Sequence, residues 1–295
     1  MLPSPCVGIC RLDNATGWCL GCARDTNELA SWRTLSPVEQ ARIWADLPRR
    51  KIILGLGFRL LSWSGEVLMA ALIDLARQPN IGWSIGVYGA VAEFVTKNAT
   101  IPEIKIGDDG LILPTSGGSL RLRPPPGTRM FELADAGRLE RRVLALHRSR
   151  LRAVPVSGVT ELGADEDAIG PAHRTERLFD LWVTRSMIRF CVRTGEASLI
   201  AALQRANGLD ALDPTVGLVP VLLASSPDRV VISPIGRIEV FGPIVRSDRG
   251  GPHTHLLPKL LACGNELDPG FALPEGYAVG ASIFSVAGTA SARVC

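Results

Sequence analysis

The sequence lacks the motifs that would assign it to a familiar class of enzyme. Gly55-x-Gly57 is not continued into a Gly-x-Gly-x-x-Gly dinucleotide motif, and there is no phosphate-binding P-loop. The chain also contains neither a Gly-x-Ser-x-Gly nucleophile elbow nor a His-Glu-x-x-His zinc motif. The commonest signatures of nucleotide binding, serine hydrolysis and metalloproteolysis are therefore missing, and the sequence does not decide whether the chain is an enzyme.

Strong charge, a long uninterrupted apolar run and a signal peptide are missing as well. The 32 basic and 29 acidic residues give a formal net charge of +3, which is too small to indicate nucleic acid or an anionic membrane as a partner. The longest apolar stretch, Ile52–Ala76, contains Arg59 and Glu66, and charges at bilayer depth are costly. The first residues provide neither the basic nor the apolar region of a signal peptide. We expect a cytoplasmic protein that neither crosses a membrane nor binds nucleic acid.

The composition indicates a globular chain, and its organisation indicates two unequal parts. The hydrophobic fraction of 46% is typical of a folded protein. Pro48–Gly57 is the expected boundary between a small unit, residues 1–50, and a larger domain, residues 57–295. A unit of about 50 residues seldom buries enough apolar surface to fold unaided, so we expect a cross-link such as a bound metal to stabilise it.

Four of the seven cysteines are candidates for forming this cross-link. Cys6, Cys10, Cys19 and Cys22 have the spacing Cys-x3-Cys-x8-Cys-x2-Cys, with a turn-forming loop between the two pairs. Four thiolates select tetrahedral zinc or an iron–sulfur cluster, and this spacing does not distinguish the two. The other cysteines are isolated and no signal peptide precedes them, so we expect reduced thiols that bind metal.

Two helices are predicted to follow the cysteines. Asp25 with Glu28 forms one capping box, and Ser36–Glu39, with proline at the first helical position, forms another. Pro48 is expected to end the second helix. The apolar stripe expected on this helix comprises Val38, Ala41, Trp44 and Ala45.

The larger domain mixes helices and strands without regular alternation, which favours an α+β fold. Met187–Arg193 is predicted to be a strand, because Ile188, Phe190 and Val192 alternate with polar residues, and a helix at Glu196–Ala206 should follow. The other expected elements are a helix at Glu66–Gln78, strands at Glu103–Ile106, Gly110–Leu113 and Ser119–Arg123, a hairpin of Arg229–Ile232 with Arg237–Phe241, and a segment, Leu139–Leu151, that fits either a helix or a strand.

Both parts of the sequence resemble uncharacterised families. The run Ser4-Pro5-Cys6-Val7-Gly8-Ile9-Cys10, followed by Gly17-x-Cys19-x-Gly21-Cys22, resembles a short bacterial domain of unknown function that is described as a predicted iron–sulfur protein. Trp83–Phe94, Arg237–Val240 and Gly251–Leu261 resemble blocks of an alphaproteobacterial family. The first resemblance implies an iron–sulfur centre at the four cysteines, and the second implies no particular activity.

Four residues form a candidate ligand site in the larger domain. In an extended chain, the imidazoles of His253 and His255 project from the same face, an arrangement that suits a divalent metal or an anion. Alternatively, they are turn residues that satisfy backbone carbonyls. Arg189 and Arg193 share one face of the predicted strand and can clamp a carboxylate or phosphate, or they form ion pairs on a solvated face.

These observations lead to two hypotheses about function. In the first, the chain is a metal-binding protein in which a four-cysteine site is joined to a small-molecule or anion-binding domain. In the second, it is a non-catalytic adaptor that contains a structural zinc ion and binds a protein partner through the N-terminal unit. Metal content and colour distinguish them, because an iron–sulfur cluster absorbs visible light and zinc does not.

Overall fold

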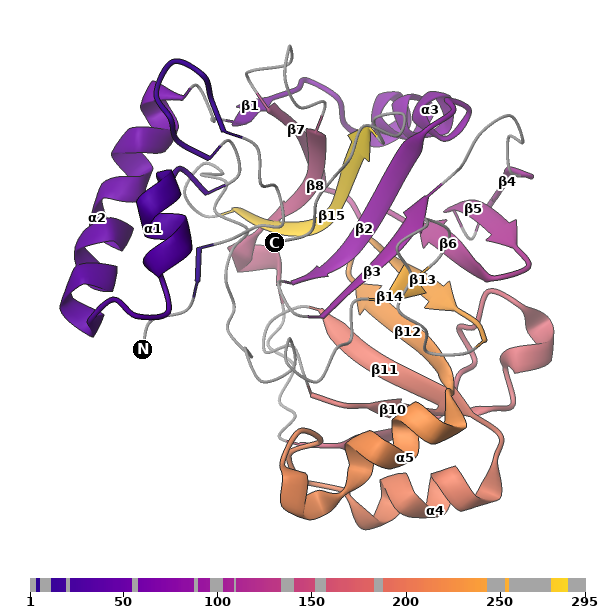
Figure 1. The fold of residues 1–295 in the computed structure, drawn as a ribbon. Coiled ribbons are helices and arrows are strands. Elements are labelled where there is room, and N and C mark those ends of the chain that lie inside the picture. The colour runs from indigo at the N-terminus through magenta and orange to yellow at the C-terminus, as the bar shows by residue number, and fades with distance from the viewer. Residues whose placement is uncertain are drawn as a thin grey trace.

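The structure is a computed structural model with a mixed α+β architecture, in which two antiparallel sheets form most of the larger domain (Figure 1). Within the part of the chain that is described, no helix is both long enough and apolar enough to span a membrane. The described residues are 4–5, 12–19, 22–54, 58–87, 90–95, 103–108, 110–133, 141–151, 158–182, 188–242, 253–254 and 277–285.

The N-terminal unit contains the two predicted helices, α1 (Thr26–Ser31) and α2 (Pro37–Ile53). Both predicted capping boxes are present. The carboxylate of Asp25 accepts a hydrogen bond from the backbone amide of Glu28 at 2.8 Å, and Glu28 accepts one from the amide of Asp25 at 3.0 Å. The Ser36–Glu39 pair repeats this exchange at the start of α2, so local sequence determines where each helix begins.

Two predictions about α2 are wrong. The helix continues through Pro48 to Ile53. Three residues of the predicted stripe, Val38, Ala41 and Ala45, are exposed, Val38 to 79%, and only Trp44 packs against the buried cluster. The side that is buried carries Gln40, Ile43, Leu47, Lys51 and Leu54. Burial on both sides of Pro48 offsets the broken helical hydrogen bond, which costs about 3 kcal/mol, so packing rather than proline determines the length of α2.

The first sheet has seven strands, and helix α3 (Gly65–Ala76) precedes its central hairpin. α3 matches the helix predicted at Glu66–Gln78, and the ambiguous segment Leu139–Leu151 contains a strand, β8. In spatial order the strands are β1 (Phe58–Leu60), β7 (Arg129–Leu133), β8 (Arg141–His147), β15 (Tyr277–Ser285), β2 (Ile81–Val87), β3 (Ala90–Val95) and β14 (His253–Thr254).

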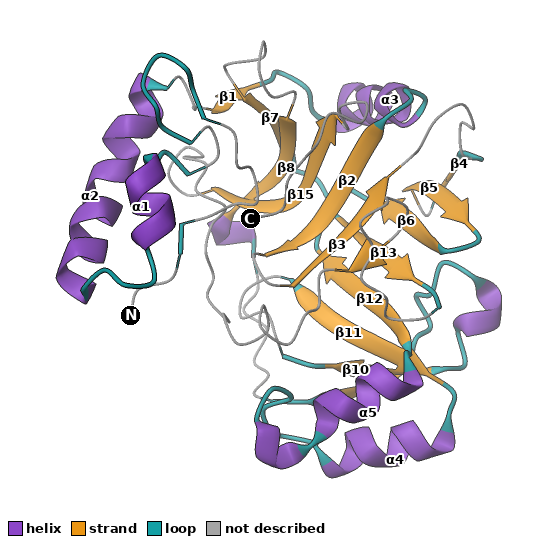
Figure 2. Ribbon diagram, viewed as in Figure 1, coloured by secondary structure: helices purple, strands orange, loops and turns teal. Residues whose placement is uncertain are grey.

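The second sheet has eight strands and includes all of the other predicted strands. Helices α4 (Ala197–Arg205) and α5 (Leu218–Ser225) lie together at one end of the molecule (Figure 2). In spatial order the strands are β4 (Lys105–Gly107), β5 (Gly110–Thr115), β6 (Gly118–Leu122), β13 (Gly236–Val240), β12 (Asp228–Ser233), β11 (Arg189–Thr194), β10 (Arg177–Asp180) and β9 (Thr160–Ala164). Short 3-10 turns occupy Arg148–Arg150, Pro171–His173 and Pro214–Val216.

The two sheets pack face to face, with β2 and β3 over β12 and β13 (Figure 1). The interior between them contains buried apolar residues from strands of both sheets, including Phe190 and Val192 of β11, as the sequence alternation predicts. Apolar residues of α3, α4 and α5 extend the same core. Each sheet therefore has a second face that points away from this core, and the candidate sites lie on these outer faces.

The N-terminal unit packs against part of the outer face of the seven-stranded sheet, on β7, β8 and β15. Trp32, Ile43 and Leu47 of this unit are buried in one cluster with Phe131 of β7 and Val143 of β8. Figure 1 shows α1 and α2 beside β7, β8 and β15. The small unit consequently shares an apolar core with the larger domain, which explains how so short a segment excludes water from its helices.

Candidate functional site

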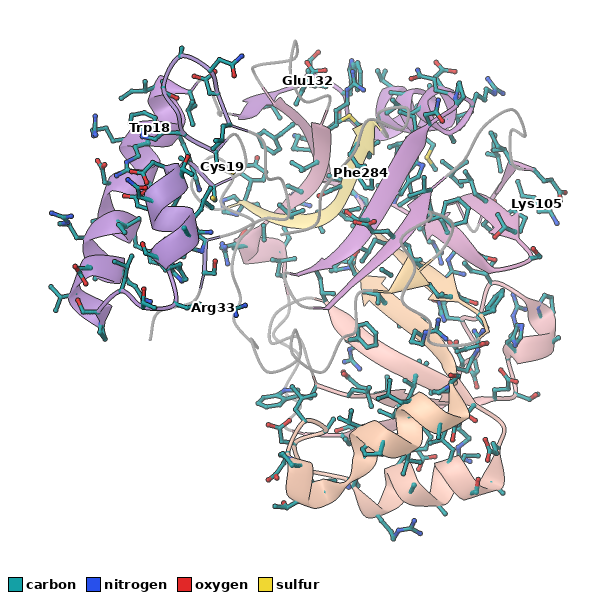
Figure 3. All side chains as sticks on the ribbon, viewed as in Figure 1. Trp18, Cys19, Arg33, Lys105, Glu132 and Phe284 are labelled. Carbon is teal, nitrogen blue, oxygen red and sulfur yellow. The ribbon has the colours of Figure 1, made fainter. Side chains whose placement is uncertain are left out.

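Two of the four cysteines of the predicted metal site lie among the described residues, whereas Cys6 and Cys10 lie outside them. Both Cys19 and Cys22 are buried. Trp18 and Cys19 lie on the loop that runs beside α1 (Figure 3). An isolated β-bridge between Leu12 and Cys19 closes this loop, as the sequence between the cysteine pairs predicts.

Asp13 builds the turn that presents Cys19. Its carboxylate accepts hydrogen bonds from the amide and the hydroxyl of Thr16, both at 2.9 Å, and its carbonyl accepts from the amide of Gly17 at 2.8 Å. Gly17 has φ = 70°, a left-handed conformation that glycine adopts without strain. The turn-forming residues therefore direct the chain back toward the second pair of cysteines.

The environment of Cys22 favours the thiolate. A hydrogen bond from Cys19 is the main cause that lowers the pKa of Cys22 to about 5, against the opposing effect of burial, and Arg24 lowers it further. The Nε atom of Arg24 donates to Cys22 Sγ at 3.4 Å. At neutral pH the sulfur of Cys22 is therefore ionised, which is the state that binds a metal ion.

Two arginines connect this loop to the rest of the N-terminal unit. The guanidinium of Arg24 lies 4.8 Å from the ring centroid of Trp32, which belongs to the apolar cluster on the sheet. Arg50 of α2 pairs with Glu28 at 2.6 Å and lies 5.4 Å from the ring centroid of Trp18. The cysteine loop is thus held by the same elements that pack against the larger domain.

A second concentration of charge occupies the outer face of the eight-stranded sheet. Arg193 of β11 and Arg237 of β13 are buried there with two carboxylates, Asp165 and Glu239, which are also buried. Nη1 of Arg193 lies 2.9 Å from Glu239 and 3.1 Å from Asp165, and Nη2 of Arg237 lies 2.6 Å from Asp165. Nε of Arg237 lies 2.9 Å from Glu239. Each inner carboxylate is therefore shared by both arginines.

The inner ion pairs determine the ionisation of the two arginines. Burial disfavours the charged form of Arg193, but Glu239 and Asp228 together raise its pKa above the usual value. Burial also lowers the pKa of Arg237, but the hydrogen bond to Asp165 and the negative charges of Glu239, Asp165 and Asp167 together raise it above the usual value. Both guanidinium groups therefore stay charged inside the network.

Around this centre the network reaches more exposed groups. Nη2 of Arg193 lies 2.8 Å from Asp228, and its Nε lies 3.2 Å from Glu176. His173 is next to these two carboxylates, on the 3-10 turn between β9 and β10. The remaining members are Arg121 and Asp167, which pair with each other. We call the set formed by Arg121, Asp165, Asp167, Glu176, Arg193, Asp228, Arg237 and Glu239 the charged network.

The structure brings only part of the predicted ligand site together. Arg193 lies in the charged network, whereas Arg189 on the same strand faces Asp180 at 3.8 Å. Burial raises the pKa of the Asp180 carboxyl group. The backbone of His253 pairs with Glu93 in the other sheet, and His255 lies outside the described residues. Ligand binding by these histidines and arginines stays a prediction.

The sequence did not single out Glu176, Asp228 or the charged network as a whole. The spacing His173-x-x-Glu176 was visible in the sequence, and it places the two side chains together on one turn, with Nδ1 of His173 3.0 Å from Oε2 of Glu176. Asp228 could not be added from spacing, because the pairing of β11 with β12 brings it opposite Arg193.

Comparison with known proteins assigns no activity to either part of the chain. The model of a family described as "Family of unknown function (DUF6925)" matches residues 68–292, more than half of the chain. The model of a second family, "Protein of unknown function (DUF1289)", matches residues 4–51. No curated protein and no solved structure shows a significant match.

Proposed function

We propose that this chain, which belongs to the family of unknown function DUF6925, is a metal-binding protein with one thiolate-ligated centre in its N-terminal unit. The proposed ligands are Cys6, Cys10, Cys19 and Cys22, and the centre is a zinc ion or an iron–sulfur cluster. The observation that carries the proposal is the buried pair of Cys19 and Cys22, in which the pKa of Cys22 is lowered to about 5.

The electrostatics of this pair support a metal site better than a purely packed thiol pair. Buried thiols in apolar surroundings have raised pKa values, as at Cys191, where burial raises the pKa well above the usual value. Cys22 is also buried, yet its pKa moves the other way because Cys19 and Arg24 donate to its sulfur. Because ligands must be deprotonated to bind metal, this environment favours metal binding at neutral pH.

The centre is proposed to act by holding the N-terminal unit on the larger domain. In this proposal, the N-terminal unit comprises residues 1–50 and the larger domain comprises residues 57–295. The protein is proposed to reside in the reducing cytoplasm. Packing of Trp32 and Leu47 against the seven-stranded sheet supports this role, because a metal that orders the cysteine loop also orders the cluster beside it. The alternative is an adaptor whose structural zinc presents this unit to a protein partner.

Metal analysis of anaerobically purified full-length protein tests the proposal. We expect one metal centre per chain. An iron–sulfur cluster would absorb at about 400 nm, whereas the zinc-containing adaptor would be colourless. Cys22→Ser should lose the metal, whereas Cys191→Ser, which changes a buried cysteine of β11 outside the N-terminal unit, should keep it. Metal-free wild-type protein, or full metal content in Cys22→Ser, would overturn the proposal.

A small anionic ligand is the second proposed function, and it concerns the larger domain. Arg189 supports it, because its guanidinium is partly exposed and its nearest carboxylate among the described residues, Asp180, lies at 3.8 Å. His253, His255 and Arg193 complete the set proposed from the sequence, although Arg193 already pairs with carboxylates of the charged network. Calorimetric titration with inorganic phosphate should show binding that Arg189→Gln weakens by about tenfold, since one charge-assisted bidentate contact is lost. Equal binding by both proteins would refute a role for Arg189.

A further inference from the structure

Three potential metal ligands converge at the edge of the charged network. One nitrogen of His173 and one oxygen each of Glu176 and Asp228 all lie within 4.8 Å of one another. Nδ1 of His173 is 3.0 Å from Oε2 of Glu176 and 3.8 Å from Oδ2 of Asp228. The three side chains come from the 3-10 turn, the segment before β10 and the start of β12.

The imidazole of His173 is held in position by its surroundings. It stacks on the ring of Phe241, with centroids 5.1 Å apart and an interplanar angle of 25°. Its edge also lies against Gly170, where an added Cβ would approach the ring at 3.0 Å. A histidine fixed in this way loses little conformational entropy when it binds an ion. It is therefore better prepared to act as a metal ligand than a mobile surface histidine would be.

The charged network carries a surplus of negative charge beside this histidine. Its ion pairs join three arginines to five carboxylates, which leaves two negative charges uncompensated. Arg229 lies next to Asp228 and its charge interacts with that carboxylate, so it offsets one of these two negative charges. With Arg229 included, the cluster still carries one net negative charge, which favours a cation at its edge.

Within the charged network, Glu176 and Asp228 are the carboxylates that contact only one arginine. Asp165, Asp167 and Glu239 each contact Arg237. Glu176 and Asp228 instead depend on Arg193, whose guanidinium already serves four carboxylates. Nε of Arg193 is buried and points at Oε2 of Glu176 from 3.2 Å, yet it makes no hydrogen bond. This oxygen therefore has a non-hydrogen-bonded ion-pair contact with the arginine and a contact with Nδ1 of His173 at 3.0 Å, which a cation bound between the two side chains would replace.

We propose that His173, Glu176 and Asp228 form a second metal site, which binds a divalent first-row cation such as Mn²⁺ or Fe²⁺. One imidazole and two carboxylates are ligands that these ions accept, and they differ from the thiolates proposed for the N-terminal centre. The three side chains are 32%, 32% and 19% exposed, so solvent reaches the site and coordination positions stay open for water or an anion.

Titration of the full-length chain with Mn²⁺, followed by electron paramagnetic resonance of the free ion, tests this site. Wild-type protein should bind one Mn²⁺ in the micromolar range. Cys19→Ser/Cys22→Ser should bind it equally well, because Mn²⁺ prefers oxygen and nitrogen ligands to thiolates. This variant therefore shows whether Mn²⁺ binds at the second site independently of the proposed N-terminal centre.

Substitution of the ligands completes the test. His173→Asn, Glu176→Gln and Asp228→Asn should each weaken Mn²⁺ binding by at least about tenfold. Two matched controls, His147→Asn and Glu161→Gln, remove an imidazole and a carboxylate outside the network and should leave binding unchanged. His173→Asn keeps every ion pair of Arg193, so it tests the site even if Asp228→Asn does not fold. Absence of saturable Mn²⁺ binding to the wild type, or equal loss in the controls, would overturn the proposal.

Discussion

Replacing Arg193 by methionine removes a cation that four carboxylates share but keeps an unbranched apolar chain in its place. Glu239 and Asp165, which are 0% and 2% exposed, would then keep their charges with only Arg237 beside them. Removing one partner of a buried ion pair costs about 3–5 kcal/mol. Because Arg237 stays in contact with both acids, we expect a loss near the lower end, about 3 kcal/mol.

Equilibrium unfolding in urea, monitored by tryptophan fluorescence, measures this loss. Arg177→Met is the matched control, because Arg177 makes an exposed pair with Glu161 on the same sheet and such pairs contribute about 0–1 kcal/mol. Adding Glu239→Gln to Arg193→Met should restore part of the stability, since the uncompensated buried charge is removed with its partner. If Arg193→Met loses no more stability than Arg177→Met, the network is not buried in solution as described.

Two further predictions concern the N-terminal unit. Leu47→Ala should destabilise the full chain by about 2–5 kcal/mol in urea unfolding, because Leu47 is buried between α2 and the sheet. Val38→Ala, on the exposed side of the same helix, should stay within about 0.5 kcal/mol, and equal effects would contradict the docking. In metal-free protein, alkylation of Cys22 by iodoacetamide should rise as the pH passes through about 5 and level off above it. Arg24→Gln removes one donor to the sulfur and should move this rise to higher pH, so an unshifted profile would exclude that hydrogen bond.

Local signals predicted local structure well. The capping residues Asp25 and Ser36 mark the first turns of α1 and α2, because their hydrogen bonds involve residues only three positions away. Alternation predicted β11 and its inward face, since a strand buried on one side must place every second residue in the core. The turn between β12 and β13 was visible for a similar reason, as proline and glycine interrupt two apolar runs.

Errors arose where tertiary packing chose between local alternatives. α2 carries apolar residues on two sides, and only the position of β7 and β8 decides that Leu47, not Val38, is buried. Leu139–Leu151 was ambiguous because its charges fit a helix as well as a strand, and pairing of β8 with β7 and β15 resolves it. No strand was predicted from the sequence at β1, β2, β3, β7, β9, β10 or β15.

The two candidate sites differ in how much of them the sequence contained. The cysteines lie close together in the chain, so their spacing alone suggested a shared ligand. In the charged network, 28 residues separate Arg193 from Asp165, 46 separate it from Glu239, and 72 separate Arg237 from Asp165. No local period connects such residues, and Arg193 could be identified only as one member of a polar strand face.

The arrangement of the sheets makes the two sites physically separate. The residues that hold the cysteine loop pack on the outer face of the seven-stranded sheet, whereas the charged network lies on the outer face of the eight-stranded sheet. Between them lies the close-packed interior, to which Met130 and Leu144 contribute from one sheet and Ile238 from the other. Because neighbouring residues of one strand serve opposite faces, a substitution on either outer face leaves the interior side chains in place. Loss of metal at one site should therefore change binding at the other only if it disrupts this shared core.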